Sequence, residues 1–299
     1  MTEDTRPRLD ELDVALIREL QRDGRATHEA LSQVLGLSRP AARTRMLRLL
    51  DSGMVRILAV VHPSVFGLDA YAHIAVTVRG AVLPVAEEIV AMPDAAFVSL
   101  ITGEHSLIAE LRSRDQAALA AAVTRISGLP GVERVATAVY TAILKDTFFL
   151  PRPYQAGTAV DDTDRRLLVE LRRDGRASFA QLGAATGLST SGARARVLRL
   201  LDTGVVHVGA RIPPGALGPA QTFGADLTFN GDPDKAVAQI LQMPETDYLS
   251  TSLGRCDAVC TFAASSPDDV LRLLDTLRSL PSITSVRAWT HLRLLKEHH

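Results

Sequence analysis

The first part of the chain carries the pattern of three short helices and a strand. Leu12, Leu16 and Leu20 recur at four-residue spacing, which places them on one face of a helix that ends near Gly24. Ser38 follows a tight Gly-Leu turn and is a typical N-cap for a longer helix. The further elements expected here are helices over 28–35 and 39–52 and a strand over 55–62. This order predicts a winged helix-turn-helix.

The next part of the chain alternates between strand and helix patterns. Short apolar runs bounded by turn residues indicate strands, and longer runs with helical spacing indicate the helices between them. The expected elements are strands over 71–78, 97–101, 107–111 and 135–144 and helices over 82–92 and 115–129. The resulting order βαββαβ is that of a ferredoxin-like domain.

The whole pattern occurs a second time, displaced by 151 residues and without a gap. Arg22–Ala26, for example, recurs as Arg173–Ala177. In the winged-helix parts 22 of 41 aligned positions are identical, whereas 12 of 80 are identical in the ferredoxin-like parts. The chain is therefore one two-part unit written twice. Its period is too long for a solenoid, whose repeats span roughly 20 to 50 residues.

These patterns predict an α+β chain in which two winged helix-turn-helix domains alternate with two ferredoxin-like domains. Pro151, Pro153 and Gly157 lie between the copies and indicate a linker. The expected domains are a winged helix at 1–62, a ferredoxin-like domain at 63–149, a linker at 150–160, a second winged helix at 161–213 and a second ferredoxin-like domain at 214–299.

Composition narrows the class of protein. The 299 residues are 46% hydrophobic and 22% charged, which is ordinary for a globular protein of more than one domain. The formal net charge of -1 excludes a globally basic nucleic-acid-coating protein, so any basic patch must be local. We expect a cytoplasmic protein without a membrane segment. No apolar run reaches the roughly 18 residues that span a bilayer, the N-terminus lacks a signal-peptide core, and there are only two cysteines.

The third helix of each copy concentrates positive charge on one side. On a helical wheel its apolar positions share one face, and the opposite face carries arginines and short polar residues. No acidic residue occurs from Ser38 to Leu50 in the first copy or from Ser189 to Leu201 in the second. The candidate DNA contacts are Ser38, Arg39, Pro40, Arg43, Thr44, Arg45 and Arg48 in the first copy and Ser189, Thr190, Ser191, Arg194, Arg196 and Arg199 in the second.

Double-stranded DNA is the partner that this helix surface fits. A helix-turn-helix places this helix in the major groove, where arginine binds phosphates and can bond both O6 and N7 of guanine. Each neutralised phosphate also releases counterions. A merely solvated amphipathic helix would show the same charges, but two copies behind the same turn favour DNA binding. The helix starts differ, Arg39-Pro40-Ala41 against Thr190-Ser191-Gly192, so we expect unequal half-sites.

These residues resemble the Lrp/AsnC family, the leucine-responsive and asparagine-type transcription regulators. The resemblance covers nearly the whole chain and rests on Leu12-Asp13 with Ile17, Asp23-Gly24-Arg25, Gly36-Leu37-Ser38, the run Arg43 to Leu49 and the run Ser52 to Val55. It implies a DNA-binding winged helix and a ferredoxin-like RAM domain that mediates dimerisation and senses an amino acid or a related small molecule. Family members usually carry one copy, so this chain resembles a covalent pseudo-dimer. Further association into homo-oligomers is also expected.

The resemblance implies effector contact at the turn between the second and third strands of the ferredoxin-like domain. The family often shows Thr-Gly-Asp-Tyr-Asp there, while the first copy reads Thr102-Gly-Glu-His-Ser106 and the second reads Leu253-Gly-Arg-Cys-Asp257. Only the second copy keeps the final aspartate, which would bond an effector amine. The two glycines equally suit a tight hairpin with positive φ. The candidate effector contacts are Thr102, Gly103, His105, Ser106, Gly254 and Asp257.

An enzyme built on the same fold is the alternative. Some enzymes that decarboxylate sirohaem resemble this family and also occur as paired or fused copies. His73, His105 and Arg112 are the residues that would hold and protonate a tetrapyrrole carboxylate. The sequence shows no catalytic motif, metal-ligand cluster or dinucleotide fingerprint, so no catalytic residue, metal or cofactor is expected. A third class, an amino-acid-binding module that does not bind DNA, fits the two arginine-bearing helices poorly.

Overall fold

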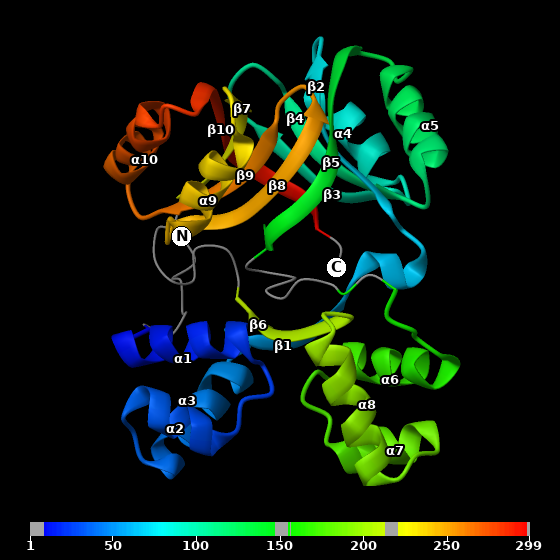
Figure 1. Ribbon diagram of the computed structural model, residues 1–299, viewed down its shortest axis with the longest axis vertical. Helices are drawn as coiled ribbons and strands as arrows, with labels where there is room; N and C mark the ends of the chain where they lie inside the picture. The colour runs from blue at the N-terminus through cyan, green and yellow to red at the C-terminus, as the bar shows by residue number, and fades with distance from the viewer. Residues whose placement is uncertain (1–8, 147–154, 156, 213–220, 298–299) are drawn as a thin grey trace. The chain divides into compact units, whose positions relative to one another are not determined.

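The computed structural model describes residues 9–146, 155, 157–212 and 221–297 (Figure 1). These residues form two compact units, and each unit combines segments of both sequence copies. The described parts of 1–62 and 148–219 make the first unit, and those of 63–147 and 220–299 make the second. Most of the expected linker at 150–160 and the boundary expected at 213–214 lie outside the described residues.

The first unit contains the two winged-helix parts. The elements are α1 (Glu11–Arg22), α2 (His28–Leu35), α3 (Arg39–Asp51) and β1 (Arg56–Val61) in the first copy, and α6 (Asp162–Arg173), α7 (Phe179–Thr186), α8 (Thr190–Asp202) and β6 (Val206–Arg211) in the second. Strands β1 and β6 pair antiparallel over their full length. Within this unit the two helical sets lie on either side of the β1–β6 ribbon (Figure 1).

Local sequence sets the bounds of these helices. Asp10 and Asp13 form a reciprocal capping box at the start of α1, and the Ser38 hydroxyl accepts the N–H of Ala41 at the start of α3. Gly36 ends α2 with a φ of 64°, a backbone conformation that favours glycine. The same devices recur at the equivalent positions of the second copy. The core of the first copy includes Leu16, Leu20, Leu31, Ala42, Met46 and Leu49.

The second unit contains the two ferredoxin-like parts, each with the order βαββαβ. The first comprises β2 (Ala70–Val78), α4 (Val82–Val90), β3 (Ala95–Ile101), β4 (Leu107–Ser113), α5 (Gln116–Ser127) and β5 (Val132–Asp146). The second comprises β7 (Gln221–Phe229), α9 (Pro233–Gln242), β8 (Thr246–Gly254), β9 (Ala258–Ala264), α10 (Pro267–Ser279) and β10 (Ile283–Glu297). A short 3-10 helix, η1 (Pro63–Phe66), precedes β2 and was not expected from the sequence.

The eight strands of the second unit close into one antiparallel barrel in the order β10-β3-β4-β2-β5-β8-β9-β7. The copies meet at two equivalent seams, because β5 pairs with β8 and β10 pairs with β3. Helices α4 and α5 pack on the strands of the first copy, and α9 and α10 pack on those of the second (Figure 1). A separate apolar cluster takes residues from both copies, among them Ala75, Tyr140, Val259 and Trp289. The α+β fold class predicted from the sequence is confirmed.

Candidate functional site: the third helices and the hairpin turns

The third helices present polar side chains at their starts and bury the faces that the helical wheel predicts. The buried positions are Ala42, Met46 and Leu49 in α3 and Ala193, Val197 and Leu200 in α8. The exposed positions include Ser38, Arg39, Pro40, Arg43 and Thr44 in the first copy and Ser189, Thr190, Ser191 and Arg194 in the second. The side chains of Arg39, Arg43 and Arg194 have no hydrogen bond or ion pair within the described part of the chain.

Arg45 and Arg48 have partners inside the protein. The Asp13 carboxylate is 1% exposed and lies 2.6 Å from Arg45 Nη1 and 2.6 Å from Arg48 Nη2. Asp10 lies 2.8 Å from Arg45 Nη1. Burial alone would raise the pKa of Asp13, but hydrogen bonds from Arg48, from the Asp10 backbone and from Arg45 lower it. These ion pairs fasten α3 to the start of α1.

The second copy repeats this arrangement, so four of the arginines proposed as DNA contacts have ion-pair partners within the protein. Arg196 and Arg199 pair with the carboxylates of Asp161 and Asp164. The helical wheel places Arg48 and Arg199 on the side opposite the core. In the structure their guanidinium groups form ion pairs with the first helix of their own copy. The structure therefore gives the arginines at 45, 48, 196 and 199 a structural role. The side chains at 39, 43 and 194 have no hydrogen-bond or ion-pair partner among the residues that the structure describes.

A reciprocal pair of arginines joins the two winged-helix parts. The motif Arg-Asp-Gly-Arg-Ala occurs once in each copy. Its second arginine donates to two backbone carbonyls of the other copy. The four bonds run from Arg25 to Gly175 (2.7 Å) and Ala177 (2.9 Å), and from Arg176 to Gly24 (2.6 Å) and Ala26 (3.2 Å). Charged donors make such bonds stronger than neutral ones.

Gly24 does more than end the first helix. Asp23 is the C-cap of α1, and the Gly24 N–H donates to the Val208 carbonyl at 2.7 Å. A Cβ built on Gly24 would lie 2.9 Å from that oxygen, closer than real Cβ atoms come. The glycine is required because the chain approaches the β6 backbone of the other copy here.

The hairpin turns between β3 and β4 and between β8 and β9 hold the candidate effector residues. Gly103 and Gly254 have φ values of 105° and 114°, so turn geometry by itself accounts for both glycines. The Thr102 N–H donates to the Thr290 carbonyl at 3.0 Å, and the Thr102 hydroxyl accepts the Thr290 N–H at 3.1 Å. His105 Nδ1 lies 3.1 Å from the Thr77 hydroxyl.

Ser106 and Asp257 perform the same structural task. Ser106 Oγ accepts the Val78 N–H at 3.1 Å, and Asp257 Oδ2 accepts the Phe229 N–H at 2.7 Å, at equivalent positions of the two copies. The carboxylate expected to meet an effector amine is therefore bonded to the backbone of its own domain. The difference between serine and aspartate does not by itself separate a binding copy from a non-binding one.

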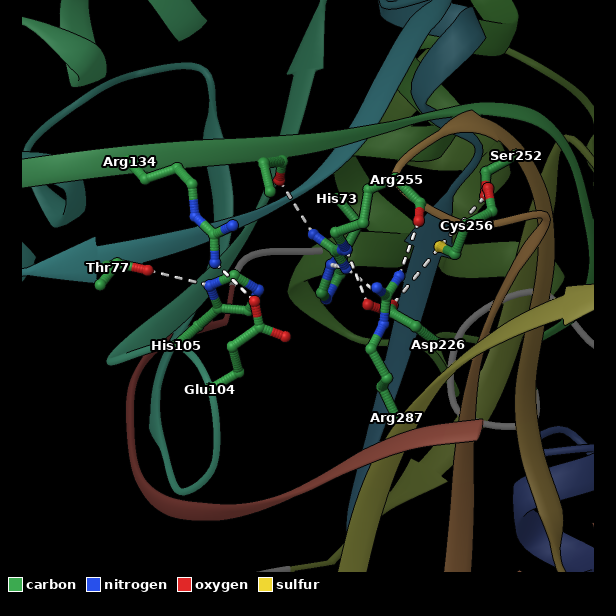
Figure 2. A network of polar contacts seen from close by, with 11 residues as sticks. His73, Thr77, Glu104, His105, Arg134, Asp226, Ser252, Arg255, Cys256 and Arg287 are labelled. Carbon is green, nitrogen blue, oxygen red and sulfur yellow. Dashed lines mark hydrogen bonds and ion pairs between the residues drawn. The ribbon is translucent and has the colours of Figure 1, made fainter. Parts of the chain in front are cut away.

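A polar network extends from the second hairpin into the barrel (Figure 2). The Arg255 side chain is 5% exposed and holds Asp226 through two bonds of 2.7 and 2.8 Å. It also donates to the Ala136 carbonyl at 3.0 Å and lies 2.7 Å from His73 Nδ1. Arginine only donates, so His73 Nδ1 accepts. Burial first, and then Arg255, hold the pKa of His73 well below its usual range. Cys256 Sγ lies 3.4 Å from Asp226 Oδ1.

Sequence reasoning missed Arg255 and Asp226. The available signals were the one charged residue in the segment 221–229 and an arginine where the first copy has Glu104. Neither signal says which way a side chain turns, and the partners are separated by 29 residues along the chain. The network depends on strand pairing that periodicity does not specify.

The residues of the enzyme alternative do not form one open site. His73 is buried against Arg255, Arg112 pairs with Glu110 at 2.7 Å, and His105 bonds Thr77. The recess beside His105 has a volume of about 30 Å³, whereas pockets for drug-sized ligands measure roughly 300 to 1,000 Å³. Among the described residues, no group of three or more His, Cys, Asp or Glu is placed to hold a metal ion. No described helix is both long enough and apolar enough to cross a membrane.

The fold and the exposed third helices define a winged helix-turn-helix protein with two fused copies. The chain matches the AsnC-type helix-turn-helix domain at residues 9–50 and again at 160–201. Residues 70–148 match the Lrp/AsnC ligand binding domain. The chain belongs to the Lrp/AsnC family of DNA-binding transcriptional regulators.

Individual relatives have about the length of one copy. HTH-type transcriptional regulator FL11 of Pyrococcus abyssi is 30% identical over 145 residues, which are 48% of this chain and 96% of that protein. HTH-type transcriptional regulator LrpA of Mycobacterium tuberculosis is 33% identical over 128 residues, 42% of this chain and 85% of that protein. The crystal structure of the siroheme decarboxylase NirDL covers 97% of this chain and 93% of its own, with a TM-score of 0.63 and 16% identity. That likeness is one of fold.

Proposed function

We propose that one chain acts in the cytoplasm as a covalent pseudo-dimer that regulates transcription. It binds a specific site on double-stranded DNA through α3 and α8 and responds to an amino acid or a related small molecule, and it is not an enzyme. The observation that carries the DNA-binding part is the exposure of Arg39, Arg43 and Arg194, whose side chains have no hydrogen bond or ion pair within the described residues. They lie on two helices of one unit, which Arg25 and Arg176 help to join.

The test is the affinity for duplex DNA from the chain's own promoter against a scrambled duplex, at several salt concentrations. We expect Arg43→Ala and Arg194→Ala each to weaken promoter binding by ~1–3 kcal/mol, the usual effect of losing one base-edge arginine. The melting temperature should stay unchanged because neither side chain has a hydrogen-bond or ion-pair partner in the described residues. Arg114→Ala, an exposed arginine of the second unit, is the matched control. Equal affinity for promoter and scrambled DNA would refute the proposal.

The two half-sites should differ. The exposed start of α3 offers Arg39 and Pro40, whereas that of α8 offers Thr190 and Ser191. An arginine reads guanine more strongly than a short hydroxyl side chain does, so one half-site should depend more on guanine than the other. A footprint in which one chain protects a perfect palindrome, with equal effects of base changes in both halves, would contradict this expectation.

Effector binding and the enzyme alternative are separated by two titrations. Thermal melting in the presence of single amino acids identifies a stabilising ligand, because a ligand that binds the folded state raises the unfolding temperature. Absorbance spectra with added sirohaem report tetrapyrrole binding. A stoichiometric coloured complex, together with no preference for promoter DNA, would move the assignment to the decarboxylase class.

We also propose that chains associate with one another. The barrel already pairs β5 and β3 across the two seams, so those strand edges are not open to a further chain. Leu253 and Leu292 are 67% and 66% exposed and offer apolar contact instead. Light scattering of the full chain should give a multiple of 32.2 kDa, and Leu292→Ser should lower that multiple. A monodisperse single chain at all concentrations would overturn the proposal.

A further inference from the structure

The two winged-helix parts differ at the first residue of their second helices. His28 begins α2, and Phe179, at the equivalent position of the second copy, begins α7. Both helices have eight residues, and the side chains of Thr27 and Ser178 cap their starts in the same way. The exchange therefore replaces an apolar ring by an ionisable one at a position where the backbone is otherwise the same.

Phe179 supports one of the two arginines that join the winged-helix parts. The Arg25 guanidinium lies over the Phe179 ring, 4.9 Å from its centre. The same guanidinium donates to the carbonyl of Ala177, two residues before the ring. A cation over the face of an aromatic ring is attracted by the charge distribution of the ring. Because phenylalanine does not titrate, this support of Arg25 is the same at every pH.

His28 takes the corresponding place beside the other arginine. Arg176 donates to the carbonyl of Ala26 at 3.2 Å, two residues before His28. The Nε2 atom of His28 is buried and has no hydrogen-bond partner among the described residues. A neutral imidazole leaves this arrangement undisturbed, whereas an imidazolium would bring two like charges together away from water.

The charges around His28 favour its neutral form. Burial is the largest cause of its lowered pKa. The further causes are the charges of three arginines, Arg176, Arg43 and Arg39. Burial also lowers the pKa of Arg176, and the carboxylates of Asp23 and Asp174 oppose that shift. A proton on His28 would therefore meet positive charge both from α3 of its own copy and from the arginine of the other copy.

We propose that His28 is a positioning residue that makes the contact between the two winged-helix parts sensitive to protonation. Neutral His28 allows Arg176 to hold the backbone of the first copy, and protonated His28 repels it. These bonds help to fix α3 and α8 relative to each other, so their loss should reduce the preference for promoter DNA. The inference rests on the proposed function, since it says what the selectivity of the DNA-binding unit depends on.

The test is the ratio of the affinities of the full chain for promoter and scrambled duplexes between about pH 5 and pH 8, where histidine titrates. A ratio is measured because attraction between a protonated histidine and phosphates is common to both duplexes. In the wild type we expect the ratio to fall about fivefold or more as the pH falls below 6.5, the ordinary pKa of histidine. His28→Phe, which supplies the residue of the second copy, should keep the ratio that it has at the upper end of this range.

Phe179→His is the matched reverse variant and should make the fall steeper, because it places a second titrating ring beside Arg25. Urea denaturation gives a readout without DNA. The unfolded state binds the proton of His28 more readily, so below pH 6.5 the wild type should lose unfolding free energy relative to His28→Phe.

Equal pH profiles of the wild type and His28→Phe, with promoter selectivity intact, would overturn the inference and leave the regulator proposal standing. A wild-type profile in Phe179→His would overturn it as well. A ratio of one at every pH would instead refute the proposed function, and this inference with it.

Discussion

At the scale of single residues, Asp13 links charge to stability. Its carboxylate accepts the Asp10 N–H at 3.1 Å and two arginine side chains while being nearly inaccessible to water. Hydrogen bonds of this kind favour the charged form, which is why the pKa of Asp13 is lowered despite its burial. The carboxylate therefore stabilises the folded state only while it is ionised.

Asp13→Asn should lower the free energy of unfolding at pH 7 by about 1–3 kcal/mol, the usual effect on hydrogen bonds to charged groups. The pKa of Asp13 is lower in the folded state than its ordinary value of 3.8, so the unfolded state binds more protons in acid. The stabilisation is complete above that ordinary value and is lost as pH falls through the lower folded pKa. Urea denaturation should show wild type and variant converging in that acid range, and a constant gap would contradict this account.

Removal of one of the two arginines that hold each buried carboxylate should affect stability as well as DNA binding. The double variant Arg48→Ala, Arg199→Ala leaves Asp13 and Asp164 with one fewer partner each. We expect a loss of ~1–3 kcal/mol in unfolding free energy per site where a charged bond is removed. Promoter affinity should fall as well, because α3 and α8 each lose an ion pair to the first helix of their own copy. Weaker DNA binding at unchanged melting temperature would instead favour direct groove contact by these arginines.

The barrel interior contains an exchange of large and small residues between the copies. Gly224 pairs with Trp289, and a Cβ on Gly224 would lie 2.2 Å from the indole. At the equivalent positions His73 pairs with Ala138, and the His73 and Trp289 rings lie 5.6 Å apart. Each copy therefore has one ring and one small residue, placed on opposite strands.

Gly224→Ala should displace the Trp289 ring and destabilise the protein by about 1–3 kcal/mol, as overpacking of a core does. Tryptophan fluorescence should shift at the same time. Combining Gly224→Ala with Trp289→Phe should cost less than the sum of the two single changes, because the smaller ring relieves the contact. Strict additivity of the unfolding free energies would show that the two residues do not constrain each other.

At the scale of elements, α8 contains a glycine where α3 has alanine. Gly192 lies in the first turn of α8, and a Cβ there would lie 3.2 Å from the Ser189 hydroxyl. In α3 the equivalent Ala41 N–H still donates to Ser38 Oγ at 3.4 Å, against 3.1 Å for Gly192 and Ser189. The first copy thus shows how the cap accommodates a methyl group.

Gly192→Ala should therefore raise the unfolding free energy by about 0.5–1 kcal/mol, because alanine loses less backbone entropy than glycine on entering a helix. Thermal melting followed by circular dichroism measures the change. Ala41→Gly in the first copy is the matched reverse substitution and should lower stability by a similar amount. A decrease for Gly192→Ala would mean that the Ser189 cap cannot adjust.

Elements were predictable where periodicity and caps are local. The order of helices and strands follows from four-residue spacing, serine caps and glycine turns, and the burial of Ala42, Met46 and Leu49 followed from the wheel. The direction of Arg48 was not predictable, because its partner Asp13 lies 35 residues away. The buried ion pair between Arg255 and Asp226 was not predictable for the same reason. Closure of the barrel depends on pairing between β5 and β8, which no local pattern encodes.

At the scale of the whole molecule, each unit needs both copies. The β1–β6 ribbon, the exchanged bonds of Arg25 and Arg176 and the two barrel seams all run between the first and second halves of the sequence. A single copy would leave the edges of β1, β3 and β5 unpaired. Unpaired strand edges promote association.

Residues 1–155 expressed alone should therefore not remain monomeric. We expect a dimer in which two first copies pair through these edges, or aggregation. Light scattering with far-ultraviolet circular dichroism distinguishes the outcomes, and the full chain is the reference. A folded monomer of the first copy would show that the seams contribute little to its stability.

The joining of both halves by one backbone has a consequence for dilution. A regulator assembled from two separate chains loses its paired form as its concentration falls toward the dissociation constant of the dimer. Here the ribbon and both barrel seams form within one polypeptide, so pairing of the halves is independent of how many molecules are present. With the proposed DNA binding by one chain, assembly of the two winged-helix parts would not limit occupancy of a site when few molecules are present, whether or not further chains then associate.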